Sequence, residues 1–219
     1  MIPYYIRYNE RSPCPSAPHL RPAYQGSNPI SDIWAVTSLQ TINKYFTRAV
    51  YDCEDLTARA EMHLASTFAG IGFGNAGVHL CHGLSYSIAG NVKRHQPAGY
   101  SCDHPIIPHG LSVVITAPAV FSFTGQSNPD RHLQAAQLLG RDISNDKRED
   151  AGPILADIMR GIMDTMKIEN GLSALGYGSE DLDSLVEGAL PQDRVNKLSP
   201  RYPLRDDLAN IYTEALTVY

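Results

Sequence analysis

Apolar side chains recur along most of this chain at the three- and four-residue spacing of amphipathic α-helices. The clearest run follows Pro153, where the apolar positions are Ile154, Leu155, Ile158, Met159, Ile162, Met163 and Met166. We expect this helix to begin at Pro153 and to end at Asn170-Gly171, because proline suits a first helical turn and glycine a helix end. No segment alternates apolar and polar residues for long enough to predict a strand.

Two more helices are predicted in the first third of the chain. Asn28-Pro29 reads as an N-cap followed by proline at the first helical position, so one helix should run from about Pro29 to Val50. A second helix should begin near Asp55. Its mostly apolar stripe, with two polar members, consists of Leu56, Ala60, His63, Leu64, Thr67 and Phe68.

A third helix is predicted from Asn75 to Ile88. His79, His82 and Tyr86 occupy positions i, i+3 and i+7 of this segment, so all three should project from one face. That face is the first candidate for chemistry.

The remaining pattern completes an all-α fold. Further helices are predicted after Pro108, around His132 to Leu139, from Ser179 to Pro191, and from Asp206 onward. The sequence therefore predicts a bundle of about seven to nine helices around one core, formed by residues 31–219. Residues 1–30 carry six prolines, which disfavour helix interiors and sheet centres, and should form an extended arm on the bundle.

Composition narrows the function classes. A hydrophobic content of 43% and a charged content of 19% are ordinary for a soluble globular protein. The net charge of -5, without a basic stripe, argues against nucleic-acid binding. The longest nearly apolar run, Leu111 to Phe123, is too short to cross a bilayer, and the N-terminus shows no targeting pattern. Four widely spaced cysteines are expected to be free thiols.

The stretch from Gly70 to Gly110 holds five of the eight histidines. Its motifs, Gly-Phe-Gly-Asn-Ala-Gly at 72–77 before a helix with His82 and Pro-His-Gly at 108–110, resemble those of the iron-containing alcohol dehydrogenase family. From Ser12 onward the chain resembles the C-terminal half of one branch. That branch passes hydride from a hydroxyacid such as 4-hydroxybutyrate to 2-oxoglutarate, in mitochondria.

The resemblance implies that His82 and His109 are two of four ligands to a divalent iron or zinc ion. A gapless match through residues 72–75 places the first ligand at His82 and not at His79. The family's other two ligands, an Asp and a His four residues apart, have no counterpart in this chain. They and the NAD-binding α/β half would precede Met1, so no NAD-binding residue is predicted here and the chain alone is expected to be inactive. The family also allows a homo-oligomer.

Other interpretations concern the same residues. Tyr86 stands where many family members carry a second His, and it is a weak candidate for proton relay because a phenol is a poor base at neutral pH. His79 would lie beside the ligands. The glycines at 72–77 satisfy Gly-x-Gly-x-x-Gly, but a predicted helix precedes them where a nucleotide site needs a strand, so close helix approach explains them better.

Two alternatives to an enzyme remain open. A helical protein could use a structural zinc ion, for which the candidate ligands are Cys81, His82, Cys102 and His104. Their spacing matches no common zinc finger. The chain could also be a non-catalytic helical fragment that associates with full-length subunits.

Overall fold

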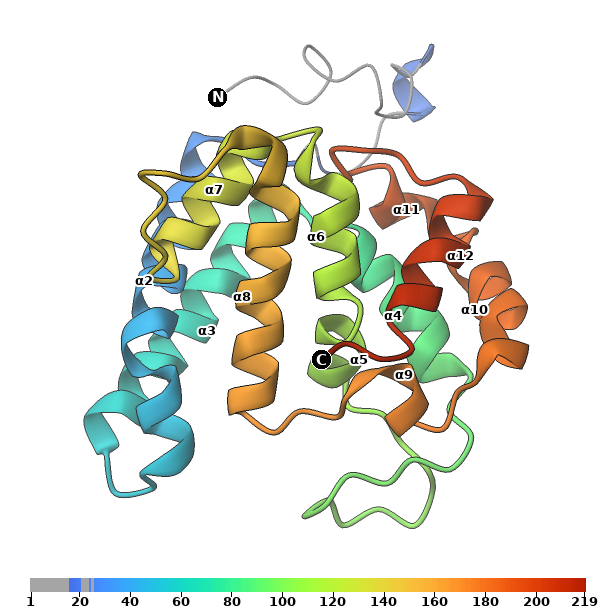
Figure 1. Cartoon of the computed structure of the whole chain (residues 1–219), viewed down its shortest axis with the longest axis horizontal. Helices are drawn as coiled ribbons and strands as arrows, with labels where there is room; N and C mark the ends of the chain where they lie inside the picture. The colour runs from blue at the N-terminus through green and yellow to red at the C-terminus, as the bar shows by residue number, and fades with distance from the viewer. Residues whose placement is uncertain (1–15, 21–23, 25) are drawn as a thin grey trace.

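Helices are the only regular elements in the part of the chain that the computed structural model describes, residues 16–20, 24 and 26–219, which confirms the all-α prediction (Figure 1). The α-helices are α2 (Pro29–Tyr51), α3 (Leu56–Ala76), α4 (Leu80–Gly90), α5 (His109–Val114), α6 (Ala117–Gly125), α7 (Pro129–Leu138), α8 (Ala151–Thr165), α9 (Gly171–Ala174), α10 (Leu182–Ala189), α11 (Asp193–Asn196) and α12 (Arg205–Glu214). Short 3-10 turns are η1 (Pro18–Leu20), η2 (Arg148–Asp150) and η3 (Ser179–Asp181). None of these helices has the length and apolar character that spanning a membrane requires.

Local capping explains where the first two helices begin. Asn28 Oδ1 accepts hydrogen bonds from the backbone N–H groups of Ile30 and Ser31, at 3.0 and 3.1 Å, and Ser31 Oγ accepts from the Asn28 N–H. The carboxylate of Asp55 caps α3 by accepting from the Ala58 N–H at 2.9 Å. These caps satisfy N–H groups that have no partner within the helix, so the predicted starts are confirmed.

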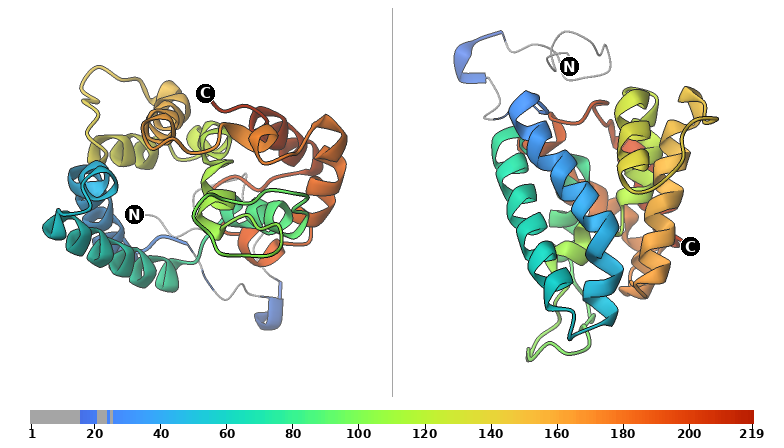
Figure 2. Two further views of the ribbon diagram at one scale, coloured as in Figure 1. Left: turned by 90° about the horizontal axis from the view of Figure 1, so that it is seen from below. Right: turned by 90° about the vertical axis from the view of Figure 1, so that its left-hand side faces the viewer.

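Helices α2 and α3 form an antiparallel hairpin at one side of the molecule (Figure 2). Its buried residues are small and recur every seven positions, namely Ser31 and Ser38 on α2 and Ala58, Ala65 and Gly72 on α3. Because small side chains let two helices approach closely, this face forms the contact inside the hairpin. The larger apolar residues of α3 point elsewhere, and Leu56 is 74% exposed.

The main core lies on the other side of the molecule and centres on α4. Its fully or almost fully buried side chains include Leu80, Leu84, Ile88, Ile115, Val120, Met163, Leu172, Leu185, Leu208 and Tyr212. Two buried hydroxyls hold α4 in place: Tyr212 donates to the Leu84 carbonyl and Tyr177 to the Ile88 carbonyl. Burial raises the pKa of Tyr177 to about 12, so its hydroxyl stays a donor.

Glycines let the core helices cross at short range. A Cβ atom on Gly125 of α6 would overlap the backbone of Gly152 on α8, and a Cβ on Gly188 of α10 would overlap Ser87 of α4. Ser87 Oγ also donates to the Leu185 carbonyl at 2.7 Å. The orientation of α4 is therefore fixed by backbone contact as well as by apolar packing.

Two predicted helices are interrupted. The segment from Asn75 to Ile88 is not one helix, because Gly77 adopts a φ of 79° and ends α3 before α4 begins at Leu80. The helix expected after Pro108 is split into α5 and α6. The ring of Pro118 would meet the Val114 carbonyl in a continuous helix, and proline has no N–H to donate to it.

The helix after residue 150 also differs from the prediction at its end. It stops at Thr165, because Lys167 adopts a left-handed φ of 57° and the Ile168 N–H returns to the Met163 carbonyl. The expected stop at Asn170-Gly171 is therefore wrong. The single-turn helices α9 and α11 were not predicted.

The predicted proline-rich arm falls largely outside the described residues. In the described part, η1 occupies Pro18–Leu20 and the Gly26 N–H donates to the Ala76 carbonyl at 3.1 Å. This bond ties the segment before α2 to the end of α3.

Candidate functional site

Two of the predicted site residues come together in space. His82 lies in the first turn of α4 and His109 opens α5, and these helices pack side by side. The two imidazole rings have centroids 5.2 Å apart and planes inclined by 60°. Although 27 positions separate them in sequence, the rings are neighbours across one helix contact.

The surroundings of His82 favour an uncharged imidazole. His82 is half-buried and His109 is exposed. Burial lowers the pKa of His82, and the charge of a protonated His109 would lower it further. A neutral imidazole keeps a lone pair for a cation, so the first condition for metal binding is met at His82.

The described residues do not supply a complete set of metal ligands. Within the described ranges, no cluster of three or more His, Cys, Asp or Glu side chains could hold a metal ion. Catalytic zinc usually has three protein ligands, and non-haem iron has at least three. The histidine pair alone therefore offers fewer ligands than such a metal ion needs.

His79 does not lie within helix α4 as His82 does, although both side chains line one cavity. It is the N-cap residue of α4, with backbone angles outside the helical region, because the chain leaves α3 at Gly77. The prediction that His79, His82 and Tyr86 project from one helix is thus wrong for His79. Tyr86 does lie on α4, four residues after His82, and Arg194 Nη2 lies 3.5 Å from its hydroxyl.

The cysteines give no support to a structural zinc site. Burial raises the pKa of Cys81 to about 12, so a cation would have to displace the thiol proton in order to bind there. Cys102 and His104 lie in the loop between α4 and α5. His104 pairs there with its neighbour Asp103, at 2.8 Å.

The glycine motif at 72–77 forms the last turn of α3 and not a loop between strand and helix. Gly72 lies against α2, where a Cβ atom would sit 3.4 Å from the Ser31 carbonyl oxygen. Close helix approach therefore explains Gly72, although the partner is α2 and not the helix that carries His82. Gly77 supplies the positive φ of the turn.

Two adjoining cavities of about 370 Å³ each lie among the helices. One is lined by α2, the end of α3 and helices α6 to α8, and the other by α4, α5, α6, α8 and the turn before α4. Val78, His79, Phe121 and Met159 contribute to the walls of both. His82 lines only one of the two cavities, and that cavity is the space next to the candidate metal ligand.

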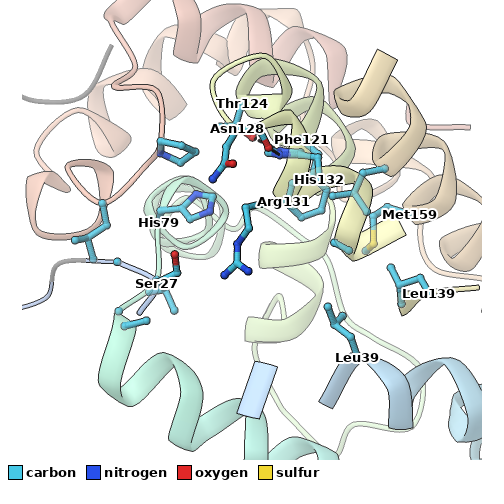
Figure 3. Close-up of a pocket in the computed structure, with 18 residues that line it drawn as sticks. Ser27, Leu39, His79, Phe121, Thr124, Asn128, Arg131, His132, Leu139 and Met159 are labelled. Carbon is cyan, nitrogen blue, oxygen red and sulfur yellow. Dashed lines mark hydrogen bonds between the residues drawn. The ribbon is translucent and has the colours of Figure 1, made fainter. Parts of the chain in front are cut away.

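The other cavity has a polar and an apolar side (Figure 3). Ser27, His79, Asn128 and Arg131 gather on one side, and Leu39, Leu139 and Met159 lie on the other. Arg131 is held there by an ion pair with Asp32. This cavity extends the space beside His82 toward α7.

The sequence profile of the Fe-containing alcohol dehydrogenase family, C-terminal, matches residues 23–216. The chain belongs to this family. Among curated proteins, it is 56% identical over 214 residues to "Hydroxyacid-oxoacid transhydrogenase, mitochondrial" of Rattus norvegicus, covering 98% of the chain and 46% of that protein. The corresponding Homo sapiens protein is 53% identical over 218 residues, which is 100% of the chain and 46% of that protein.

Solved structures of an alcohol dehydrogenase and of a 1,3-propanediol oxidoreductase contain this helical fold. A 1,3-propanediol oxidoreductase superposes with a TM-score of 0.76 at 24% identity, covering 86% of the chain and 46% of that structure. Alcohol dehydrogenase from Oenococcus oeni gives 0.75 at 23% identity, with 86% and 45% covered. The chain thus spans about half the length of the curated relatives and structures it matches. Its named relatives are oxidoreductases.

Proposed function

We infer that this chain supplies the metal-binding, helical side of the active site in an oxidoreductase that moves hydride from a hydroxyacid to an oxoacid. The observation that carries this inference is the convergence of His82 and His109 at the contact of α4 and α5. The names of the rat and human relatives support the pair of substrate classes. We take 4-hydroxybutyrate and 2-oxoglutarate as the substrate pair, and mitochondria as the location.

The residues of this chain suit specific parts of that chemistry. His82 and His109 would hold a divalent iron or zinc ion, and ligands from the other half of the active site would complete its coordination. When bound, the metal would polarise the substrate C–O bond and NAD would carry the hydride. Oxidation of the hydroxyacid also releases the proton of its hydroxyl group. Tyr86, one helical turn beyond His82, is our candidate to pass this proton toward solvent.

The test uses a chimera in which the amino-terminal half of the rat relative precedes this chain. His82→Ala and His109→Ala should each abolish bound metal, measured by elemental analysis, and hydride transfer. His79→Ala is the matched control and should retain the metal, because His79 lies outside helix α4. Equal metal loss in all three variants would contradict the assignment of the ligands. The 219-residue chain alone should show no turnover with the two substrates.

An alternative is a non-catalytic chain that associates with complete subunits. Exposed apolar side chains on the hairpin favour it, among them Ile30, Ile33, Leu56, Leu64, Ile71 and Phe73. Co-expression with the full-length rat relative distinguishes the two ideas. Stable co-purification without bound metal at His82 and His109 would support the non-catalytic role.

A further inference from the structure

The single-turn helix α11 lies against α4 at the turn that carries His82. Gly83, the residue after His82, makes this approach possible: a Cβ atom there would overlap Asn196 Oδ1 and lie 3.4 Å from Val195 Cγ2. Asn196 is 3% exposed, and its Nδ2 donates to the Ala189 carbonyl at 2.9 Å. The position of α11 relative to His82 is therefore fixed by buried contacts.

Arg194, the second residue of α11, extends from this fixed base toward Tyr86. Its Nη2 lies 3.5 Å from the Tyr86 hydroxyl, and its side chain is exposed to solvent. The adjacent carboxylate of Asp193 is occupied by Lys197 at 2.7 Å and by the Tyr202 hydroxyl at 3.0 Å. No ion pair of Arg194 is found in the part of the chain that the structure describes, whereas most other arginines there have an acidic partner. Those paired arginines are Arg48, Arg131, Arg141, Arg148, Arg160, Arg201 and Arg205.

The spacing along α4 suits a short acid. Tyr86 is four residues beyond His82, which is a rise of about 6 Å along the helix, on the same face. The hydroxyl oxygen and a carboxylate oxygen of extended 4-hydroxybutyrate are five bonds apart, or roughly 6 Å given carbon–carbon bonds of about 1.5 Å. A molecule with its hydroxyl group at His82 would thus bring its carboxylate about one turn along α4, within reach of the Arg194 guanidinium.

We propose that Arg194 binds the carboxylate of the hydroxyacid and oxoacid substrates and so sets the preference for acids over plain alcohols. The proposal rests on the function proposed above and names a residue that selects its substrate. A guanidinium group offers two parallel N–H donors to a carboxylate, and charge-assisted bonds of this kind are among the strongest hydrogen bonds in proteins. Arg194 would contribute to the binding of the substrate and would make no contact with the carbon atom that loses or gains the hydride.

The experiment compares Arg194→Gln with Arg59→Gln in the chimera described above. Arg59 is an exposed arginine of α3, so the control removes the same charge from the surface far from α11. For Arg194→Gln we expect KM for 4-hydroxybutyrate to rise roughly 10- to 100-fold, the effect of losing one charge-assisted hydrogen bond. KM for butan-1-ol, which has no carboxylate, should stay within about twofold of wild type, and Arg194→Lys should restore part of the affinity because it keeps the charge.

A second measurement, competitive inhibition, tests carboxylate binding without turnover of the acid that carries the carboxylate. Butyrate should inhibit the wild-type chimera and Arg59→Gln competitively, whereas butyramide, its uncharged analogue, should inhibit much less. Inhibition by butyrate should weaken by the same roughly 10- to 100-fold in Arg194→Gln. Bound metal should be equal in all these proteins.

The outcomes separate the two proposals. If the wild-type chimera oxidises 4-hydroxybutyrate and Arg194→Gln raises KM equally for the acid and for butan-1-ol, the role of Arg194 is overturned and the proposed function stands. If butyrate inhibits Arg194→Gln as strongly as wild type, the role is likewise overturned. If the metal-loaded wild-type chimera oxidises butan-1-ol but not 4-hydroxybutyrate, the proposed substrate class is overturned.

Discussion

Gly83→Ala is the sharpest probe of how this fold positions its histidines. The added methyl group would overlap Asn196 Oδ1 and lie 3.1 Å from Asn196 Cγ. The Asn196 side chain cannot swing aside at no cost, because its Nδ2 donates to the Ala189 carbonyl in a site that is 3% exposed. The contact between the helices is therefore overpacked, and the hydrogen bond of Asn196 is broken as well.

The magnitude follows from three contributions. Overpacking a well-filled contact costs about 1–3 kcal/mol. Breaking the Asn196 bond and leaving the buried amide without a partner costs about 1–3 kcal/mol. The better helix propensity of alanine offsets about 1 kcal/mol. Adding the midpoints of these contributions, we expect Gly83→Ala to lower the free energy of unfolding by about 3 kcal/mol.

Urea unfolding followed by circular dichroism measures this change, with Gly161→Ala as the matched control. Gly161 lies within α8, and a Cβ atom there would meet nothing within 4 Å, so alanine should stabilise by about 1 kcal/mol. In an Asn196→Ala background, Gly83→Ala should lose most of its cost, because the overlapping amide is gone. Equal stability of Gly83→Ala and Gly161→Ala would refute the close contact of α4 and α11.

Two further predictions concern His132 and Asn170. Burial lowers the pKa of His132, which is 8% exposed, so below a pH of about 6.5 the unfolded chain takes up a proton that the folded chain does not, and the free energy of unfolding should decrease as the pH is lowered. In urea unfolding, His132→Gln should lose less stability than wild type between about pH 7.5 and about pH 5.5. An equal loss in the two proteins would contradict this role of His132. Asn170 Oδ1 accepts from the N–H groups of Val218 and Tyr219 at 2.9 Å each, so Asn170→Ala should cost about 1–2 kcal/mol and speed hydrogen exchange at the Val218 amide. Unchanged protection of that amide would show that Asn170 does not hold the C-terminus.

The sequence predicted those features of the fold that depend on neighbouring residues. Asn28 and Pro29 start a helix by local capping chemistry, and the apolar spacing after residue 153 identifies α8. The end of α8 was missed because a lysine, Lys167, adopts the left-handed conformation that usually marks glycine. The end of α5 at Val114 is explained by Pro118, because a proline ring clashes with the carbonyl group four residues before it in a helix.

The site was only partly predictable. The approach of His82 to His109 depends on the packing of α4 on α5, which periodicity cannot reveal, and only the resemblance to the family paired them. On α3 the large apolar residues Leu56 and Leu64 suggested the wrong buried face. The buried face is formed by the small residues Ala58, Ala65 and Gly72. Arg194 was missed because its link to Tyr86 joins residues 108 positions apart.

The thin interior of the α2–α3 hairpin has a consequence for motion. A two-helix unit that buries only serines, alanines and a glycine is attached to the core helices by a few polar links, such as Asp32 with Arg131 and the Tyr51 hydroxyl with the Thr165 carbonyl. We expect such a unit to open at a lower free energy than the core, as one cooperative piece, while α4 stays folded. Since Leu39 and Ala76 of the hairpin line one of the two cavities, each such opening also changes how easily small molecules reach that space.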